Sequence, residues 1–503
     1  MKTVSILVYF ASVLAVASAN ETSSQLKASS PLPQGVQNTS DYQAAKNQAS
    51  EKPNIIYLML DEWGYYEMSG LGHEKISTPT FDQVLAEGMR FTQCLAGGPV
   101  CGPTRASLMT GKHLGHTSMR SNGGATPIRA DDVTIAQLLK EAGYATGGFG
   151  KWGIGGRGTS GVPEKHGFDL FYGYYDQVHA HTYYPPYLIR NSEEVILPGN
   201  GHSFYEGKHY AQDLIFDEAV TFIKRNADKP FFCYLPWTPP HGLWGIPEDD
   251  PAWLEFKDKD ASWDFGQQTK RDARVYAAML KMCDRQLGDI MKLLKTLKID
   301  DNTIIFLCGD NGGQAYFQKP NGFFGPNVDP KTGKRVFRGG KGQLYEGGLR
   351  IPFMVRWPGK IKAGTTTEHL CYFPDVMPTV AELAGLPKPP DTDGITLLPT
   401  LLGKGQQQQH DYLYWEAGNW QSVRYQNWRW HLKTKKTVEL YDLSSDISET
   451  TNVAAKHPDM VAKLTRFAQS AHTPIRPGEI YDRTLMDKDH NKTKPKMKKR
   501  LKK

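Results

Sequence analysis

The sequence predicts an α/β protein with a large doubly wound sheet, mixed but mostly parallel and flanked by helices, and a small C-terminal α+β subdomain with an antiparallel sheet. Three observations support this prediction. Near-continuous apolar runs of strand length recur along the chain, and helical patterns alternate with them. After Gly403 the pattern changes to short segments typical of antiparallel strands. The chain has 503 residues, 39% of them hydrophobic, which excludes wholesale disorder.

Four predicted strands are near-continuous apolar runs that lead into polar residues. Apolar runs without alternation suit parallel strands that helices cover on both faces. These runs are 54–60, 144–149, 230–235 and 303–308, and 353–357 is typical of a further strand. The first four lead into side chains that can do chemistry: Asp61 and Glu62, Lys151, His241, and Asp310 and Asn311. Because ligands gather beyond the carboxyl ends of strands in such sheets, we expect these side chains to share one site.

Helical patterns fill the intervals. Residues 134–142 place apolar side chains on one face before Gly143, and residues 275–297 repeat apolar residues at helical spacing. After Gly403, residues 412–415, 421–425 and 428–434 are typical of short antiparallel strands, and residues 457–470 predict a helix. This pattern defines the small α+β subdomain.

The chain is expected to divide into five parts. Residues 1–19 resemble a secretory signal, with Lys2, an apolar run and Ala17-Ser18-Ala19 before the cleavage point. An uncleaved N-terminal anchor is the alternative. A flexible leader (20–51), a catalytic α/β domain (52–404), the α+β subdomain (405–475) and a basic tail (476–503) follow. The mature protein is therefore expected to be secreted or periplasmic, with no membrane span once the signal is cleaved.

The net charge of +7 is concentrated at one end. Residues 488–503 contain nine Lys or Arg and one acid, so they carry +8 and leave residues 1–487 at −1. A nucleic-acid enzyme would carry its basic residues on the folded surface, so we expect no nucleic-acid partner. The tail is expected to be solvated, or else to adhere to an acidic surface or polyanion.

Cys101 differs from the other cysteines. The chain has six Cys, too few for a disulfide framework in a body of this size, and Cys283 and Cys308 lie in apolar patterns typical of buried thiols. Cys101 begins Cys101-Gly-Pro-Thr-Arg105, where Pro103 suits the first turn of a helix. Backbone N–H groups at a helix N-terminus favour negative charge, and Arg105 lies four positions on, on the same face. An anion at position 101 would therefore meet both.

The two acidic pairs predict a cation site. Asp61, Glu62, Asp310 and Asn311 are hard oxygen donors at two strand ends, a set that suits Ca²⁺ or Mg²⁺. The sequence shows no His/Cys spacing typical of zinc.

Several motifs, in order from about residue 53 to 470, resemble the formylglycine-dependent (type I, arylsulfatase-like) sulfatases of the alkaline-phosphatase superfamily. Cys-x-Pro-x-Arg followed by Ser107-Leu-Met-Thr-Gly resembles the maturation motif of that family. Similar segments of this chain are 60–64, 150–152, 239–241, 309–312, 340–352 and 439–443 with 452–454.

The resemblance implies a mechanism. A maturation enzyme would oxidise Cys101 to formylglycine (3-oxoalanine), whose hydrated aldehyde attacks sulfur beside one bound Ca²⁺ held by Asp61, Glu62, Asp310, Asn311 and residue 101. Arg105, Lys151 and Lys341 would offset negative charge in the transition state. His241, with Lys341 beside it, is the candidate for protonating the leaving alcohol.

The chain departs from the family pattern at two positions. The family usually has His where this chain has Gly153, and Asp where it has Glu62. Our hypothesis is that His179 or His181 takes over the proton transfer of the missing His; otherwise these residues contact substrate or pack in the core.

A sulfated carbohydrate is the predicted substrate, since the chain resembles an exported enzyme with a near-neutral body. Several aromatic residues in Pro-rich stretches can stack on sugar rings, with packing in the core as the alternative for each: Tyr183, Tyr184, Tyr187, Trp237, Trp244, Trp253 and Trp263. The alternatives are a phosphate or phosphonate ester hydrolase on the same scaffold, and a non-catalytic protein that binds sulfated glycans.

Overall fold

The computed structural model describes residues 52–122, 126–201, 203, 206–259, 273–314, 327–434 and 436–491. The predicted signal, the leader, Trp263 and the end of the basic tail lie outside these residues. Within the described residues, no helix is long and apolar enough to cross a membrane.

A ten-stranded sheet forms the centre of the protein, in the order β11-β2-β10-β9-β1-β8-β4-β5-β6-β7. Five neighbouring strands in this order, β9-β1-β8-β4-β5, run parallel, whereas β10, β6 and β7 pair antiparallel at the two flanks. This arrangement confirms the predicted mixed, mostly parallel sheet. The strands are β1 (Asn54–Leu60), β2 (Met89–Phe91), β4 (Ala145–Lys151), β5 (Leu170–Tyr174), β6 (Tyr187–Arg190), β7 (Glu193–Ile196), β8 (Phe231–Trp237), β9 (Thr303–Gly309), β10 (Phe353–Arg356) and β11 (Thr365–Thr367). A separate pair joins β3 (Cys94–Leu95) to β12 (Cys371–Tyr372).

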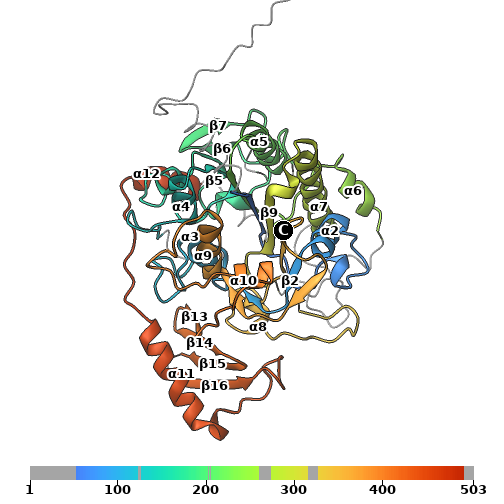
Figure 1. Cartoon of the computed structure of the whole chain (residues 1–503). Coiled ribbons are helices and arrows are strands. Elements are labelled where there is room, and N and C mark those ends of the chain that lie inside the picture. The colour runs from blue at the N-terminus through green and yellow to red at the C-terminus, as the bar shows by residue number, and fades with distance from the viewer. Residues whose placement is uncertain are drawn as a thin grey trace, which may run out of the picture. The chain divides into compact units, whose positions relative to one another are not determined.

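Helices cover both faces of this sheet, as Figure 1 shows. Alternate residues of β1 enter two different cores: Ile56 and Leu58 pack with side chains of α2, α5 and α7, and Tyr57 and Met59 pack with those of α3, α4 and α9. Burial on both faces is the reason that the strand sequences are apolar throughout. The helices are α2 (Pro79–Glu87), α3 (Cys101–Thr110), α4 (Ile135–Glu141), α5 (Ala211–Arg225), α6 (Pro251–Phe256), α7 (Ala273–Thr296), α8 (Glu346–Leu349), α9 (Val376–Leu383) and α10 (Leu398–Leu402).

A four-stranded antiparallel sheet follows, with α11 (Pro458–Ala471) alongside it (Figure 1). Its strands are β13 (Leu413–Ala417), β14 (Trp420–Tyr425), β15 (Trp428–Lys433) and β16 (Thr437–Asp442). The sheet confirms the predicted antiparallel element, with β16 as an additional strand. Trp415 donates its indole N–H to the Ala96 carbonyl at 2.8 Å, and Arg120 meets Glu416 at 2.5 Å, so β13 is fastened to the segments around α3. The proposed division at residues 404/405 remains a prediction.

The chain after α11 differs from a solvated tail. Residues 476–491, here named the C-terminal strap, end in α12 (Arg483–Asn491), and Met486 and Asp489 of this helix are buried. The predicted tail of residues 476–503 is therefore wrong for the part up to Asn491, where the density of basic residues masks a helix that packs on the domain. All six cysteines are buried free thiols, as predicted for Cys283 and Cys308.

Candidate active site

Cys101 opens α3, and every residue of that helix is buried. The backbone N–H of Gly102 donates to Asn122 Oδ1 at 2.9 Å, which fixes the first turn. The Cys101 thiol lies 3.4 Å from Asp61 Oδ1 and 3.2 Å from Lys341 Nζ. The sequence-predicted position at a helix start therefore brings the thiol against a carboxylate and an ammonium group.

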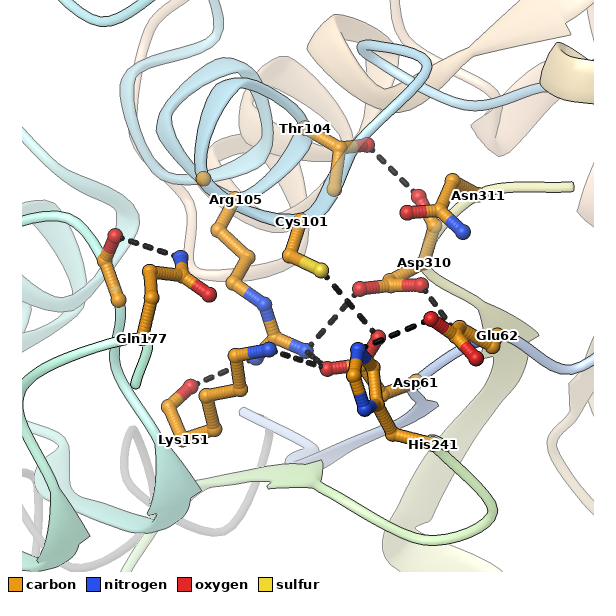
Figure 2. Close-up of polar contacts among 12 residues, drawn as sticks. Asp61, Glu62, Cys101, Thr104, Arg105, Lys151, Gln177, His241, Asp310 and Asn311 are labelled. Atoms are coloured by element: carbon orange, nitrogen blue, oxygen red, sulfur yellow. Dashed lines mark hydrogen bonds and ion pairs between the residues drawn. The ribbon is translucent and has the colours of Figure 1, made fainter. Parts of the chain in front are cut away.

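Arg105 reaches the same place from one turn further along α3, as Figure 2 shows. Its Nη2 lies 3.2 Å from Asp310 Oδ2 and 3.4 Å from Asp61 Oδ2, and its Nη1 donates to the Lys151 carbonyl at 2.6 Å. Because the guanidinium is fully buried, these carboxylates are the charges that balance it.

Asp61 follows β1 and is surrounded by cations. Lys151 Nζ, at the end of β4, lies 2.5 Å from Asp61 Oδ2, and Lys341 Nζ lies 3.7 Å from Asp61 Oδ1. Burial opposes ionisation of Asp61, but Lys151, His241, Lys341 and Arg105 together hold the pKa of this carboxyl well below its ordinary value. The carboxylate is therefore ionised at neutral pH.

Glu62 links His241 to Lys341. Its Oε1 lies 2.9 Å from His241 Nε2 and 2.5 Å from Lys341 Nζ, and it also accepts from Gln314 Nε2 at 3.1 Å. Burial lowers the pKa of His241, but the Glu62 charge outweighs it, and the pKa rises to about 9. His241 therefore carries a proton at neutral pH, as a general acid requires.

The ends of β1 and β9 bring the predicted metal donors together (Figure 2). Asp310 Oδ1 accepts the Glu62 backbone N–H at 3.1 Å, and Asn311 Oδ1 is buried without a hydrogen-bond partner among the described residues. Burial, and then the charge of Asp61, raises the pKa of Asp310 to about 6. An unpaired amide oxygen beside two crowded carboxylates fits a hard divalent cation. Glu62 differs, since its carboxylate already faces Lys341 and His241, and its ligation stays a prediction.

The structure separates the two histidines that were proposed for proton transfer. His181 Nε2 lies 3.4 Å from Lys151 Nζ, and its ring stacks on His241 with centroids 3.9 Å apart. His179 is buried instead between Tyr174 and Tyr187, and its Nε2 contacts the Tyr187 carbonyl at 3.0 Å. Burial, His241 and Lys151 hold the pKa of His181 well below its ordinary value, so its imidazole is neutral.

Gln177 fills the space beside Gly153. Gly153 has φ +75°, and a Cβ there would lie 2.3 Å from Gln177 Nε2. That amide donates to the Gly153 carbonyl at 2.8 Å. A side chain at position 153 would therefore need a strained backbone and a displaced Gln177.

Core packing, the alternative to stacking on sugar rings, holds for most of the aromatic residues in the Pro-rich stretches. Five of them are buried: Tyr183, Tyr184, Tyr187, Trp237 and Trp244. Trp253 is partly buried against the same core, and Trp263 lies outside the described residues. Pro-rich flanks suggested loops, whereas the buried rings pack in the cores on the two faces of the sheet.

Sequence reasoning missed several residues that support the site. Thr104 donates its hydroxyl to the Asp310 carbonyl at 2.8 Å, and Gln314 contacts Glu62. Glu67 accepts the Gly64 N–H at 2.8 Å and the Tyr276 hydroxyl, and burial raises its pKa to about 7. Only Thr104, inside the Cys101–Arg105 pattern, had a sequence signal.

Comparisons with known proteins agree with this geometry. The family model "Sulfatase" matches residues 53–386, and the model "N-sulphoglucosamine sulphohydrolase, C-terminal" matches residues 340–470. The chain is 29% identical to the N-acetylgalactosamine-6-O-sulfatase of Bacteroides thetaiotaomicron, over 86% of this chain and 95% of that protein. It is 31% identical to the arylsulfatase of Hemicentrotus pulcherrimus, over 76% of this chain and 68% of that protein. The solved structure of Ps i-CgsB in complex with k-i-k-neocarrahexaose matches with a TM-score of 0.70 and 25% identity, over 90% of this chain and 100% of that one.

Proposed function

Because the chain belongs to the sulfatase family and is a sulfuric ester hydrolase, we propose that it hydrolyses sulfate monoesters of a carbohydrate, with formylglycine at position 101 and bound calcium. The carbohydrate substrate is supported by the name of the Bacteroides relative and by the oligosaccharide in the Ps i-CgsB complex. Activity measured on a panel of sulfated sugars would identify the sugar and the position of the sulfate that is removed.

The arrangement of cations supports binding of an anion at residue 101. Lys341 contacts the Cys101 side chain, and Lys151 and Arg105 pair with Asp61, whose carboxylate lies 3.4 Å from the Cys101 thiol. These three cations would hold the sulfate oxygens and offset the charge that develops on them in the transition state. They are fixed by buried ion pairs, so little reorganisation is needed when the ester binds.

Two groups would complete this chemistry. Asp61, Asp310 and Asn311, with Glu62 as a predicted fourth ligand, would hold Ca²⁺, which supplies a Lewis acid for the sulfate oxygens. Oxidation of Cys101 to formylglycine by a maturation enzyme would supply an oxygen nucleophile. In the overall reaction the sulfur–oxygen bond to the sugar breaks, and water provides the oxygen and the proton that appear in the products.

Proton transfer is assigned to the two stacked histidines. His241 is protonated at neutral pH and would donate its proton to the leaving sugar oxygen. His181 is neutral and lies beside Lys151, so we propose it as the acceptor of the proton released at residue 101, in place of a side chain at Gly153. Lys341, which shares Glu62 with His241, would help to stabilise the leaving oxygen.

The convergence of Cys101, Arg105, Lys151, His241 and Asp310 on one buried site carries this proposal. The test is peptide mass spectrometry of protein from its native source, with activity on a panel of sulfated sugars. Conversion of Cys101 lowers the peptide mass by about 18 Da. We expect the modified protein to release sulfate and Cys101→Ala to release none. An unmodified thiol, or full desulfation by the Ala variant, would contradict the proposal.

The same panel separates the alternatives. Phosphate and phosphonate esters of the same alcohols test the second hydrolase activity, and binding of sulfated sugar without turnover would indicate a glycan-binding protein. We also propose export to the periplasm or medium, supported by the signal-like residues 1–19. Fractionation of the producing cells, with N-terminal sequencing of the mature chain, tests that assignment.

A further inference from the structure

The C-terminal strap, residues 476–491, reaches the segments that surround the site. It lies beyond residue 470, where the match to the family models ends. Its backbone N–H groups at Tyr481 and Asp482 donate to the Gly158 carbonyl at 2.8 and 2.9 Å. In α12, Met486 packs on Gly156, so closely that a Cβ added there would lie 3.1 Å from Met486 Cγ. The strap is thus attached to the loop that follows Lys151.

Asp489 anchors α12 through a buried ion pair. Its carboxylate accepts from Arg157 Nε at 2.8 Å and Nη2 at 2.6 Å, and from the Tyr187 hydroxyl at 2.6 Å. Asp489 is 1% exposed and Arg157 is 4% exposed. A buried bidentate pair holds a fixed geometry, and removing one partner leaves an uncompensated buried charge.

The next residue of α12 continues this contact. His490 Nδ1 lies 3.1 Å from Asp176 Oδ2, and Asp176 Oδ1 accepts the backbone N–H groups of Val178 and His179 at 2.7 and 3.0 Å. Asp176 therefore holds the turn that leads into the short 3₁₀ helix η3 (His179–His181). Residues 176–182 are here named the η3 segment.

A second connection runs from Asp489 through Tyr187. The Tyr187 hydroxyl contacts Asp489, and the Tyr187 carbonyl contacts His179 Nε2, the first residue of η3. The last residue of η3, His181, stacks on His241 and contacts Lys151. The η3 segment also carries Gln177, which closes the space at Gly153. One end of a three-residue helix is thus linked to the strap through Asp176 and Tyr187, and the other end contacts the site.

We propose that Asp489 and His490 are positioning residues: they hold the η3 segment so that His181 keeps its place beside Lys151 and His241. Their effect on His181 passes through Asp176, His179 and Tyr187. The expected effect on turnover rests on the proposed function, whereas the effect on His181 geometry does not.

The test compares Asp489→Asn and His490→Gln with Asp487→Asn in the full chain. Asp487 lies in the same helix and shows no hydrogen bond or ion pair within the described residues, so its variant is a matched control for charge. Two quantities are measured on the folded fraction of each protein. These are kcat and KM on a sulfated sugar, and the rate at which diethyl pyrocarbonate acylates His181, mapped by peptide mass spectrometry.

We expect kcat to fall about 10-fold in Asp489→Asn and His490→Gln with KM changed less than about 2-fold, because a misplaced catalytic group costs rate rather than binding. We also expect His181 to be acylated faster than in the wild type, since its stacking on His241 is loosened. Unchanged acylation in both variants, or a loss of kcat fully explained by loss of folded protein, would overturn the proposal. If the wild type desulfates no substrate, the proposed function fails, and the acylation rates alone still decide the positioning role.

Discussion

The imidazole rings of His181 and His241 are stacked, with centroids 3.9 Å apart and an interplanar angle of 11°. Two stacked imidazolium ions would repel each other, so this contact favours one charged and one neutral ring. Glu62 selects His241 as the charged ring, and burial with the His241 charge keeps His181 neutral. The pair therefore holds a proton donor and a proton acceptor in one contact.

Replacing His241 by Asn should slow turnover by a factor of about 10² to 10⁴, the usual contribution of a general acid. The loss should be larger for a sugar sulfate than for an aryl sulfate, because a phenolate leaves without a proton more easily than an alkoxide. Steady-state kinetics on both substrate types measures the difference. His472→Asn is the control, since His472 contacts Glu416 rather than any predicted site residue. Equal losses on both substrates would contradict the acid role.

Asp310→Asn should distinguish two effects on the Tm: the cost of an ionised Asp310 without a cation, and the stabilisation by bound calcium. Burial and Asp61 raise the pKa of Asp310, so its ionised form is unfavourable without a cation, and the Asn variant should have a higher Tm than the wild type in chelator. Calcium should raise the Tm of the wild type and leave that of the variant unchanged.

The control for calcium binding is Asp393→Asn. Asp393 lies with His113 and His116 in a second group of possible metal ligands, but His113 Nδ1 accepts the Gly115 N–H at 3.1 Å, so its Nε2 carries the proton and is unsuited to a metal. We expect this variant to keep the calcium-induced rise in Tm. If Asp310→Asn kept the calcium-induced rise in Tm and Asp393→Asn lost it, calcium would bind at the His113–His116–Asp393 group, and the proposed site at Asp310 would be contradicted.

Glu346→Gln should lower the free energy of unfolding by about 3–5 kcal/mol, because it leaves buried guanidinium groups without their counter-charge. Glu346 is fully buried, accepts from Arg350 Nε at 2.7 Å and lies 3.4 Å from Arg424 of β14. Urea unfolding gives the difference. The control, Glu439→Gln, removes a carboxylate paired with partly exposed Lys433 and should cost less than about 1 kcal/mol.

Asp284→Asn should change stability in a pH-dependent way. Burial raises the pKa of Asp284 in α7 from 3.8 to about 6, so the folded protein binds this proton more tightly than the unfolded chain does. The ionised group therefore costs stability above pH 6, by up to about 3 kcal/mol, and costs nothing below its unfolded pKa. Thermal unfolding at pH 8 should show the Asn variant stabilised, and this gain should shrink as pH falls through about 6 towards 4. A gain independent of pH would contradict the assignment.

The parallel strands of the sheet could be predicted from sequence because burial on both faces leaves a continuous apolar run. The predicted run 54–60 is β1 itself, and β4, β8 and β9 differ from their predictions by one or two residues. The chemical side chains at their ends could be grouped for the same reason, since parallel strands deliver their carboxyl ends to one edge. The short strands β6 and β7 left no comparable signal, as β7 alternates weakly and is partly exposed.

Residues that act through a single long-range contact could not be predicted. Gln177 approaches Gly153 across 24 positions, and Asp489 pairs with Arg157 across 332. Neither residue lies in a periodic pattern, and a lone Asp within a basic segment is typical of a solvated surface. The two histidines of the η3 segment were equivalent in sequence, and only the turn of η3 places His181 toward Lys151 and His179 toward Tyr187.

Complete burial of α3 would set an order of events for the proposed oxidation of Cys101. Cys101 is 1% exposed and is enclosed by segments that begin at Asp61 and end near Lys341, so the thiol becomes inaccessible once these segments have assembled. An oxidising enzyme that held this stretch of chain in its own cleft would therefore have to act on a nascent or incompletely folded polypeptide. Chains that fold before they meet that enzyme would be trapped as stable but unmodified protein.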